Sequence, residues 1–192
     1  MGRSMKSNIL WVTSTAVFIA LLVTMQAVTA PLGNQFVTGS VVNLILIIAL
    51  LTRGLTSGLA VAAISPIFAA LVGVGPAFPP LVPFIALGNI VFILAWFLFG
   101  KLLKSDKPGI RYKVIGYLIA VVAALIKFLT LYAGIVLIAI PHILSLNEKQ
   151  SAVLSLNFSY PQMITAVIGG IIALTVVPPI QKALRSQMKQ TK

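Results

Sequence analysis

The sequence predicts an all-α integral membrane protein, built as a bundle of six transmembrane helices. Of its 192 residues, 59% are hydrophobic and only 8% are charged, which leaves too little polar surface to surround a soluble core. The apolar residues also fall into six runs, most of them near the roughly 20 residues that a helix needs to cross a bilayer about 30 Å thick. We therefore expect residues 1–192 to form a single transmembrane domain.

The predicted helices are separated by short polar or Gly-Pro-rich segments. They cover approximately residues 8–30, 38–52, 55–72, 81–100, 114–140 and 159–177. The first apolar run is too long for a signal peptide, and Thr29-Ala30-Pro31 is a poor cleavage site, so we expect a retained helix. Arg53-Gly54 predicts a tight turn that joins the second and third helices as a hairpin.

Proline and glycine mark the remaining boundaries. A Gly-Pro-rich loop over residues 73–80 precedes the fourth helix, and Pro141 is expected to end the fifth. A polar loop is predicted from His142 to Asn157. Pro178-Pro179 is expected to close the sixth helix before a basic tail.

The net charge of +12 is distributed in a way that predicts topology. The basic residues lie at the ends of apolar runs and are not interleaved with aromatic residues, which argues against a nucleic-acid partner. With the N-terminus in the cytoplasm, twelve of the fourteen lysines and arginines fall on the inside: Arg3, Lys6, Arg53, Lys101, Lys104, Lys107, Arg111, Lys113, Lys182, Arg185, Lys189 and Lys192. Only Lys149 falls outside, so both termini are predicted to be cytoplasmic.

The chain lacks the residues that several functional classes require. The chain has no cysteine, one histidine (His142) and two acidic residues, Asp106 and Glu148, so neither a catalytic cluster nor a metal site is expected. It also lacks the phosphate-binding loop of an ATPase. We predict a non-catalytic protein without a cofactor.

Lys127 is the exception to the charge pattern, because it lies near the middle of the fifth predicted helix. A lysine at that depth costs several kcal/mol unless something compensates for it. Two interpretations are open: the side chain snorkels to a boundary or binds free backbone carbonyls, or it supplies positive charge to an anionic ligand.

Other polar residues gather in the outer halves of the helices and predict a ligand pocket there. With Lys127, the candidate substrate-binding residues are Asn34, Gln35, Asn43, Asn89, Tyr132 and Gln162. Amides also serve as hydrogen-bonding contacts between membrane helices, which is the alternative for each of them. Trp11 and Trp96 are expected as anchors at the inner boundary.

The sequence resembles the substrate-capture subunit (S component) of energy-coupling factor (ECF) vitamin transporters. The resemblance is strongest over Leu32–Gly39 (LGNQFVTG) continuing to Asn43, over AISP ending at Pro66, and over PFIALGN ending at Asn89. It implies that the ligand is held near the outer side under the first outer loop, where Asn34, Gln35 and Phe36 are expected.

The same resemblance implies partners. Ala16 and Ala20 match the small-residue pattern of the family's first helix, which docks on a transmembrane coupling subunit that works with two cytoplasmic ATPases. The bacterial plasma membrane is the implied location, with membrane lipid around the bundle.

The expected ligand is a water-soluble vitamin or precursor. Pantothenate is slightly favoured, because an unpaired lysine suits a carboxylate and amides suit its hydroxyls and amide. A hydroxymethyl-pyrimidine thiamin precursor is the main alternative, and riboflavin fits less well. A self-sufficient small transporter or channel, or a membrane scaffold, would be a different class of protein.

Overall fold

The protein is helical throughout the part that the computed structural model describes, residues 2–105 and 109–190, where no strand occurs. The long helices are α1 (Gly2–Thr29), α2 (Gln35–Arg53), α3 (Leu55–Leu71), α4 (Val82–Gly100), α5 (Ile110–Leu131) and α8 (Tyr160–Gln190). A π-helix (Tyr132–Ala139) and α6 (Ile140–His142) continue α5, and α7 (Glu148–Asn157) precedes α8. Short 3₁₀ segments cover Ala30–Leu32, Pro79–Leu81 and Lys101–Ser105.

The described chain contains five helical segments that are long and apolar enough to cross a membrane. Helix α3 is apolar but shorter, at 17 residues. These lengths confirm a helical protein built to lie in a membrane.

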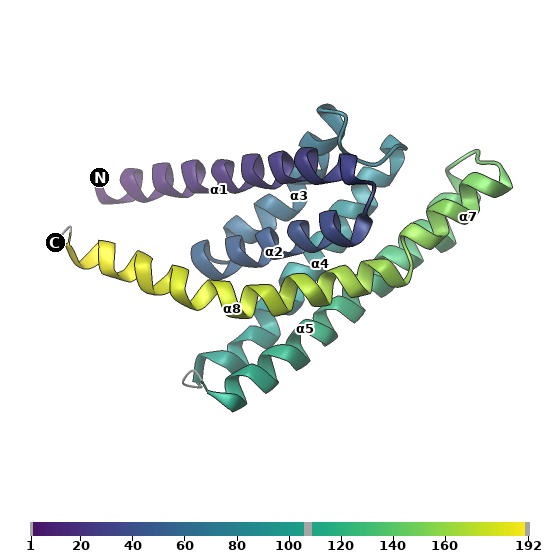
Figure 1. The fold of residues 1–192 in the computed structure, drawn as a ribbon. Helices are drawn as coiled ribbons and strands as arrows, with labels where there is room; N and C mark the ends of the chain where they lie inside the picture. Colours follow the sequence, from purple (N-terminus) through teal and green to yellow (C-terminus); the bar gives the residue numbers. More distant parts are fainter. Residues whose placement is uncertain (1, 106–108, 191–192) are drawn as a thin grey trace.

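Five of the helices enclose the core, and α1 lies outside them (Figure 1). Helix α8 packs between α2 and α5. Helix α4 packs between α5 and α3, and α3 also packs against α2, which closes the ring. The centre is filled by side chains without solvent exposure, among them Phe92 and Trp96 of α4 and Leu46 and Ile47 of α2. Helix α1 packs on α2 and α3, where the buried hydroxyls of Thr15 and Ser57 are hydrogen-bonded at 2.8 Å.

The two ends of the bundle differ. The N- and C-terminal ends lie at the same end, and α7 lies at the opposite one (Figure 1). The exposed basic side chains Arg53, Lys101, Arg111, Lys113 and Lys182 belong to the end that carries the termini. Asp106, Lys107 and Lys192 are outside the described residues.

Helices α2 and α8 run in the same direction and approach closely through two glycines. A Cβ atom on Gly39 would lie 2.9 Å from Thr165 Cγ2, and one on Gly169 would lie 2.8 Å from both Asn43 Cβ and the Ser40 carbonyl oxygen. Each helix therefore places a glycine against a polar residue of the other, which sets the spacing of α2 and α8.

Residues 142–157 are not the loop that the sequence predicted, because they contain helix α7. Its start is fixed by a capping box: Asn147 Oδ1 accepts from the Gln150 N–H at 2.9 Å, and Gln150 Oε1 accepts from the Asn147 N–H at 3.2 Å. This reciprocal pair satisfies two donors that the first turn otherwise leaves free.

Replacing Asn147 with Ala is expected to destabilise α7 by about 1 kcal/mol, because one amide of its first turn loses its acceptor. Hydrogen exchange should quicken about fivefold across α7, while Ser145→Ala, just before the cap, leaves exchange unchanged. Equal exchange in the two variants would contradict a stabilising role for the cap.

Helix α8 also departs from the prediction, since it continues through Pro178 and Pro179 to Gln190 instead of ending at Val177. Each proline removes the hydrogen bond of its missing N–H group, and its ring crowds the carbonyl four residues earlier. Beyond them, Gln181 Nε2 donates to the Leu51 carbonyl oxygen at 2.8 Å, so α2 holds the continued helix in place.

Two further local features differ from expectation. The π-helix Tyr132–Ala139 was not predicted, and its Gly134 admits the Phe84 ring, which a Cβ would meet at 2.7 Å. Trp96 is not a boundary anchor: it is fully buried and packs edge-on against Phe92. Trp11, by contrast, is exposed and donates to Thr56 Oγ1 at 3.1 Å.

Candidate functional site

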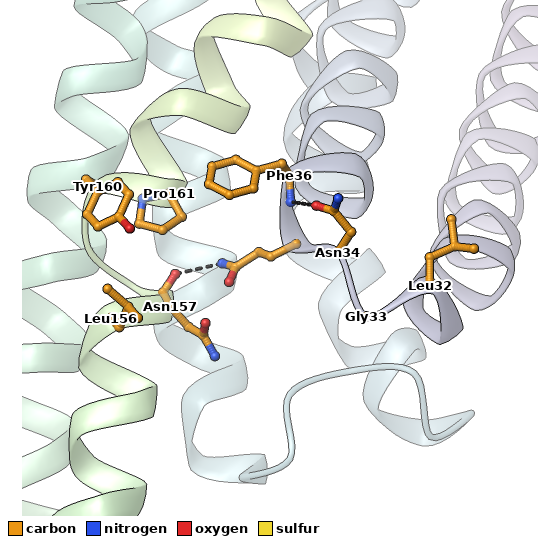
Figure 2. Close-up of a pocket in the computed structure, with 9 residues that line it drawn as sticks. Leu32, Gly33, Asn34, Phe36, Leu156, Asn157, Tyr160 and Pro161 are labelled. Atoms are coloured by element: carbon orange, nitrogen blue, oxygen red, sulfur yellow. Dashed lines mark hydrogen bonds between the residues drawn. The ribbon is translucent and has the colours of Figure 1, made fainter.

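An open depression of about 530 Å³ lies at the end of the bundle that carries α7. It is formed where α1 passes into α2 and where α7 passes into α8, and its lining residues are Leu32, Gly33, Asn34, Gln35, Phe36, Leu156, Asn157, Tyr160 and Pro161. Figure 2 shows the Phe36 ring directed from α2 toward Tyr160 and Pro161 at the start of α8. We call this depression the outer pocket.

The α2 side of the outer pocket is built by a helix cap. Gly33 has φ 64°, a conformation that glycine adopts readily, and it turns the chain toward α2. Asn34 is the cap residue, and its Oδ1 accepts from the Phe36 N–H at 2.9 Å (Figure 2). Gln35 and Phe36 therefore belong to the first turn of α2, whereas the sequence placed them in a loop before a helix at Thr38.

The two sides of the outer pocket are joined through one carbonyl. The Asn157 carbonyl oxygen, at the end of α7, accepts from Gln35 Nε2 at 2.7 Å and from Gln162 Nε2 at 3.1 Å. Gln35 thus holds the α7–α8 junction against α2, and Gln162 ties the start of α8 to the end of α7.

A second polar cluster lies deeper, around Lys127. The ammonium is buried, with 3% of the residue exposed, and donates to Asn43 Oδ1 at 2.6 Å and to Asn89 Oδ1 at 2.7 Å. It also lies 5.1 Å from the centroid of the Phe92 ring, within the range of a cation–π contact. Because a lysine ammonium has no acceptor, both amides must present their oxygens to it.

Of the two interpretations of Lys127, the structural one differs in detail from the contacts found. Among the described residues the ammonium binds side-chain amides, and neither reaches a boundary nor binds backbone carbonyls, while its role toward an anionic ligand stays a prediction. Long side chains tilt toward the start of their helix. In α5 this direction leads the ammonium toward Asn43, and the asparagines of α2 and α4 meet it there.

A chain of hydrogen bonds connects the outer pocket with Lys127. Gln162 starts the chain at the pocket, and its carbonyl oxygen accepts from Thr165 Oγ1 at 3.1 Å. Thr165 Oγ1 in turn accepts a long bond of 3.4 Å from Asn43 Nδ2, whose other acceptor is the Gly39 carbonyl oxygen at 2.9 Å. Asn43 then accepts from Lys127, so the polar contacts run without a break along the α2–α8 seam.

The structure places the predicted site residues in two groups and leaves one apart. Asn34 and Gln35 line the outer pocket, and Gln162 bonds to its edge. Asn43, Asn89 and Lys127 form the deeper cluster. The ring of Tyr132 instead packs against Phe128, with 5.7 Å between the centroids, and Tyr132 is not among the residues that line the outer pocket.

The candidate binding residues chosen from the sequence do not include those that line the α7–α8 side of the outer pocket, nor Thr165. Leu156 and Pro161 give no polar signal, and they line the pocket because they lie on either side of the junction between α7 and α8. Asn157 acts through its backbone carbonyl, which residue type does not reveal. Thr165 had a usable signal, since it is a polar residue in an apolar helix.

The predicted docking residues Ala16 and Ala20 are exposed on α1. The buried positions of this helix, including Thr15 and Leu22, face α2 and α3. The small-residue pair therefore lies on a side of α1 that the rest of the chain leaves uncovered.

Comparison with protein-family models, with curated proteins and with solved structures finds no significant match.

Proposed function

We propose that this protein is the substrate-capture subunit of an ECF-type importer and binds a water-soluble vitamin or vitamin precursor in the outer pocket. The observation that carries the proposal is the row of polar contacts that leads from Gln162, at the edge of the pocket, through Thr165 and Asn43 to the buried ammonium of Lys127. An ionisable side chain inside a membrane is costly and is by default a candidate for a functional site. Pantothenate remains the favoured ligand, because its carboxylate matches the cation and its polar groups match the pocket amides.

The proposed topology adds the shorter helix α3 to the five long apolar segments, which gives six membrane-spanning helices. Both termini are then in the cytoplasm of a bacterium. The exposed basic residues at the terminal end support this orientation. It places the outer pocket on the extracellular side, where a nutrient arrives.

The proposed partners are a transmembrane coupling subunit, docked along Ala16 and Ala20 of α1, and two cytoplasmic ATPases. The exposure of both alanines supports this role. The chain itself is proposed to be non-catalytic and to obtain its energy from those ATPases.

The hydroxymethyl-pyrimidine alternative is favoured by a different observation. Phe36 and Tyr160 both line the outer pocket and offer aromatic surface for a planar ring. A binding panel of pantothenate, hydroxymethyl-pyrimidine, thiamin and riboflavin on the purified protein separates these ligands.

Replacing Gln35 with Ala is expected to weaken binding about tenfold for whichever ligand of the panel the protein binds. The α7–α8 junction loses a hydrogen bond to α2, and the pocket loses an amide. Gln181→Ala is the matched control, since it also removes a glutamine bond to a backbone carbonyl, but at the opposite end of the bundle. Isothermal titration of both variants tests the site, and equal affinities would contradict it.

Purification under mild conditions tests the class of protein. Recovery of a helical membrane subunit with two ATPases supports the capture role. Transport in vesicles without any ATPase would identify a self-sufficient transporter instead and overturn the proposal.

A further inference from the structure

We propose that the outer pocket selects negatively charged ligands, and that Asn43 and Asn89 determine this selectivity by holding Lys127 without neutralising it. The inference rests on the proposed function and adds the charge class of the ligand and two specificity-determining residues.

The charge balance around Lys127 is the first step. Every side chain that faces the ammonium in the described structure is neutral: Asn43 from α2, and Asn89 and Phe92 from α4. The whole chain has only two carboxylates, Asp106 and Glu148, and Glu148 is exposed at the start of α7. Among the described residues, no aspartate or glutamate therefore lies within a membrane helix to pair with this lysine.

Unused hydrogen-bonding capacity is the second step. An ammonium has three donors, and the described structure gives oxygen acceptors to two of them. One turn nearer the pocket, the hydroxyl of Ser40 is buried and has no partner among the described residues. Neither donor is offset by a described acceptor, and α2 and α8 pack too closely there for a ligand to neutralise them by contact, so the positive potential is left to act on the pocket.

The direction of the helices is the third step. Helices α2 and α8 both begin at the outer pocket, so the positive ends of two helix dipoles point to it. The opposing negative end of α7 is offset locally, because the Asn157 carbonyl already accepts from Gln35 and Gln162. Lys127 and the starts of α2 and α8 therefore all contribute positive electrostatic potential at the outer pocket.

The distance allows Lys127 to favour an anion in the pocket without direct contact. At about 1.5 Å per residue, Asn43 lies about 10 Å along α2 from Phe36 at the pocket. At that separation in a protein interior, one uncompensated charge favours an anion over a neutral analogue by about tenfold.

The test compares acids with uncharged analogues of the same shape. Isothermal titration of the purified full-length protein uses three pairs: pantothenate with panthenol, nicotinate with nicotinamide, and biotin with its primary amide. In the pair that the protein recognises, we expect the acid to bind at least about tenfold more tightly than its uncharged analogue.

Asn89→Asp supplies the decisive variant, because it keeps the shape and the acceptor for Lys127 while adding the missing negative charge. The preference for the acid should fall about tenfold, while affinity for the neutral analogue stays the same. Asn43→Asp should act in the same way, and it serves if the first variant fails to fold. A merely structural role would change both affinities together.

The outcomes separate the two proposals. Equal binding of acid and analogue by the unmodified protein, or tight binding of neutral hydroxymethyl-pyrimidine, overturns charge selection and leaves the capture role intact. An unchanged acid preference in both Asp variants removes the role of the asparagines. If no vitamin in either panel binds to the folded protein, the proposed function itself fails.

Discussion

Asn89→Ala is expected to destabilise the protein by about 3 kcal/mol, because it leaves the buried ammonium of Lys127 with one acceptor in place of two. The only hydrogen bond of the Asn89 side chain in the described structure is the one from Lys127, at 2.7 Å. The loss therefore reports on this contact and on the small cavity that truncation creates. Thermal unfolding in detergent micelles measures it.

The partner of that contact provides the control. Adding Lys127→Met to Asn89→Ala should recover about 2 kcal/mol, since the group that needed the acceptor is gone. Recovery would not follow if truncation acted only through the cavity, because the methionine adds nothing at position 89. Additive losses in the double variant would show that Lys127 does not depend on Asn89.

Gly169→Ala is expected to cost about 3 kcal/mol and to disrupt the Lys127 cluster, because there is no room for a methyl group between α8 and α2. The added Cβ would lie 2.8 Å from Asn43 Cβ and from the Ser40 carbonyl oxygen, and 2.9 Å from the Leu44 nitrogen. Two of these three atoms belong to the α2 backbone, so relief requires the helices to separate. The same unfolding assay, together with ligand titration, detects both effects.

Gly100→Ala is the matched control for that substitution. Gly100 ends α4, and no atom lies within 4 Å of the position that its Cβ would take. Alanine is a better helix former than glycine, so stability should stay the same or rise by up to about 1 kcal/mol. Equal losses in the two variants would show that the cost comes from the backbone and not from the α2–α8 contact.

The boundaries that sequence reasoning missed share a physical cause. Proline and glycine were treated as local stop signals, yet α8 continues through Pro178 and Pro179 because α2 holds the continuation through Gln181. The segment before Asn157 was judged by its polarity, whereas the capping box of Asn147 and Gln150 makes it helical. In both cases side-chain hydrogen bonds support a helix that proline content or polarity alone does not indicate: those of Asn147 and Gln150 lie within the local sequence, and that of Gln181 reaches α2.

The candidate site was predicted in part. An unpaired lysine among amides indicated a polar site, and Lys127, Asn43 and Asn89 do lie together. Tyr132 shared their depth in sequence but packs against Phe128. Depth along a helix can be counted from the sequence, but the face on which a residue lies relative to its neighbours depends on how the helices rotate and cross.

Composition and the length of the apolar runs determined that this chain is helical and built for a membrane, because a helix of that length satisfies its own backbone hydrogen bonds in lipid. The sequence also isolated Lys127 as a charge without a carboxylate partner. Only the tertiary structure decided what meets that charge. The ammonium bonds to Asn43 and Asn89 because α2, α4 and α5 converge on it, and it connects with the outer pocket because Gly39 and Gly169 bring α2 and α8 together.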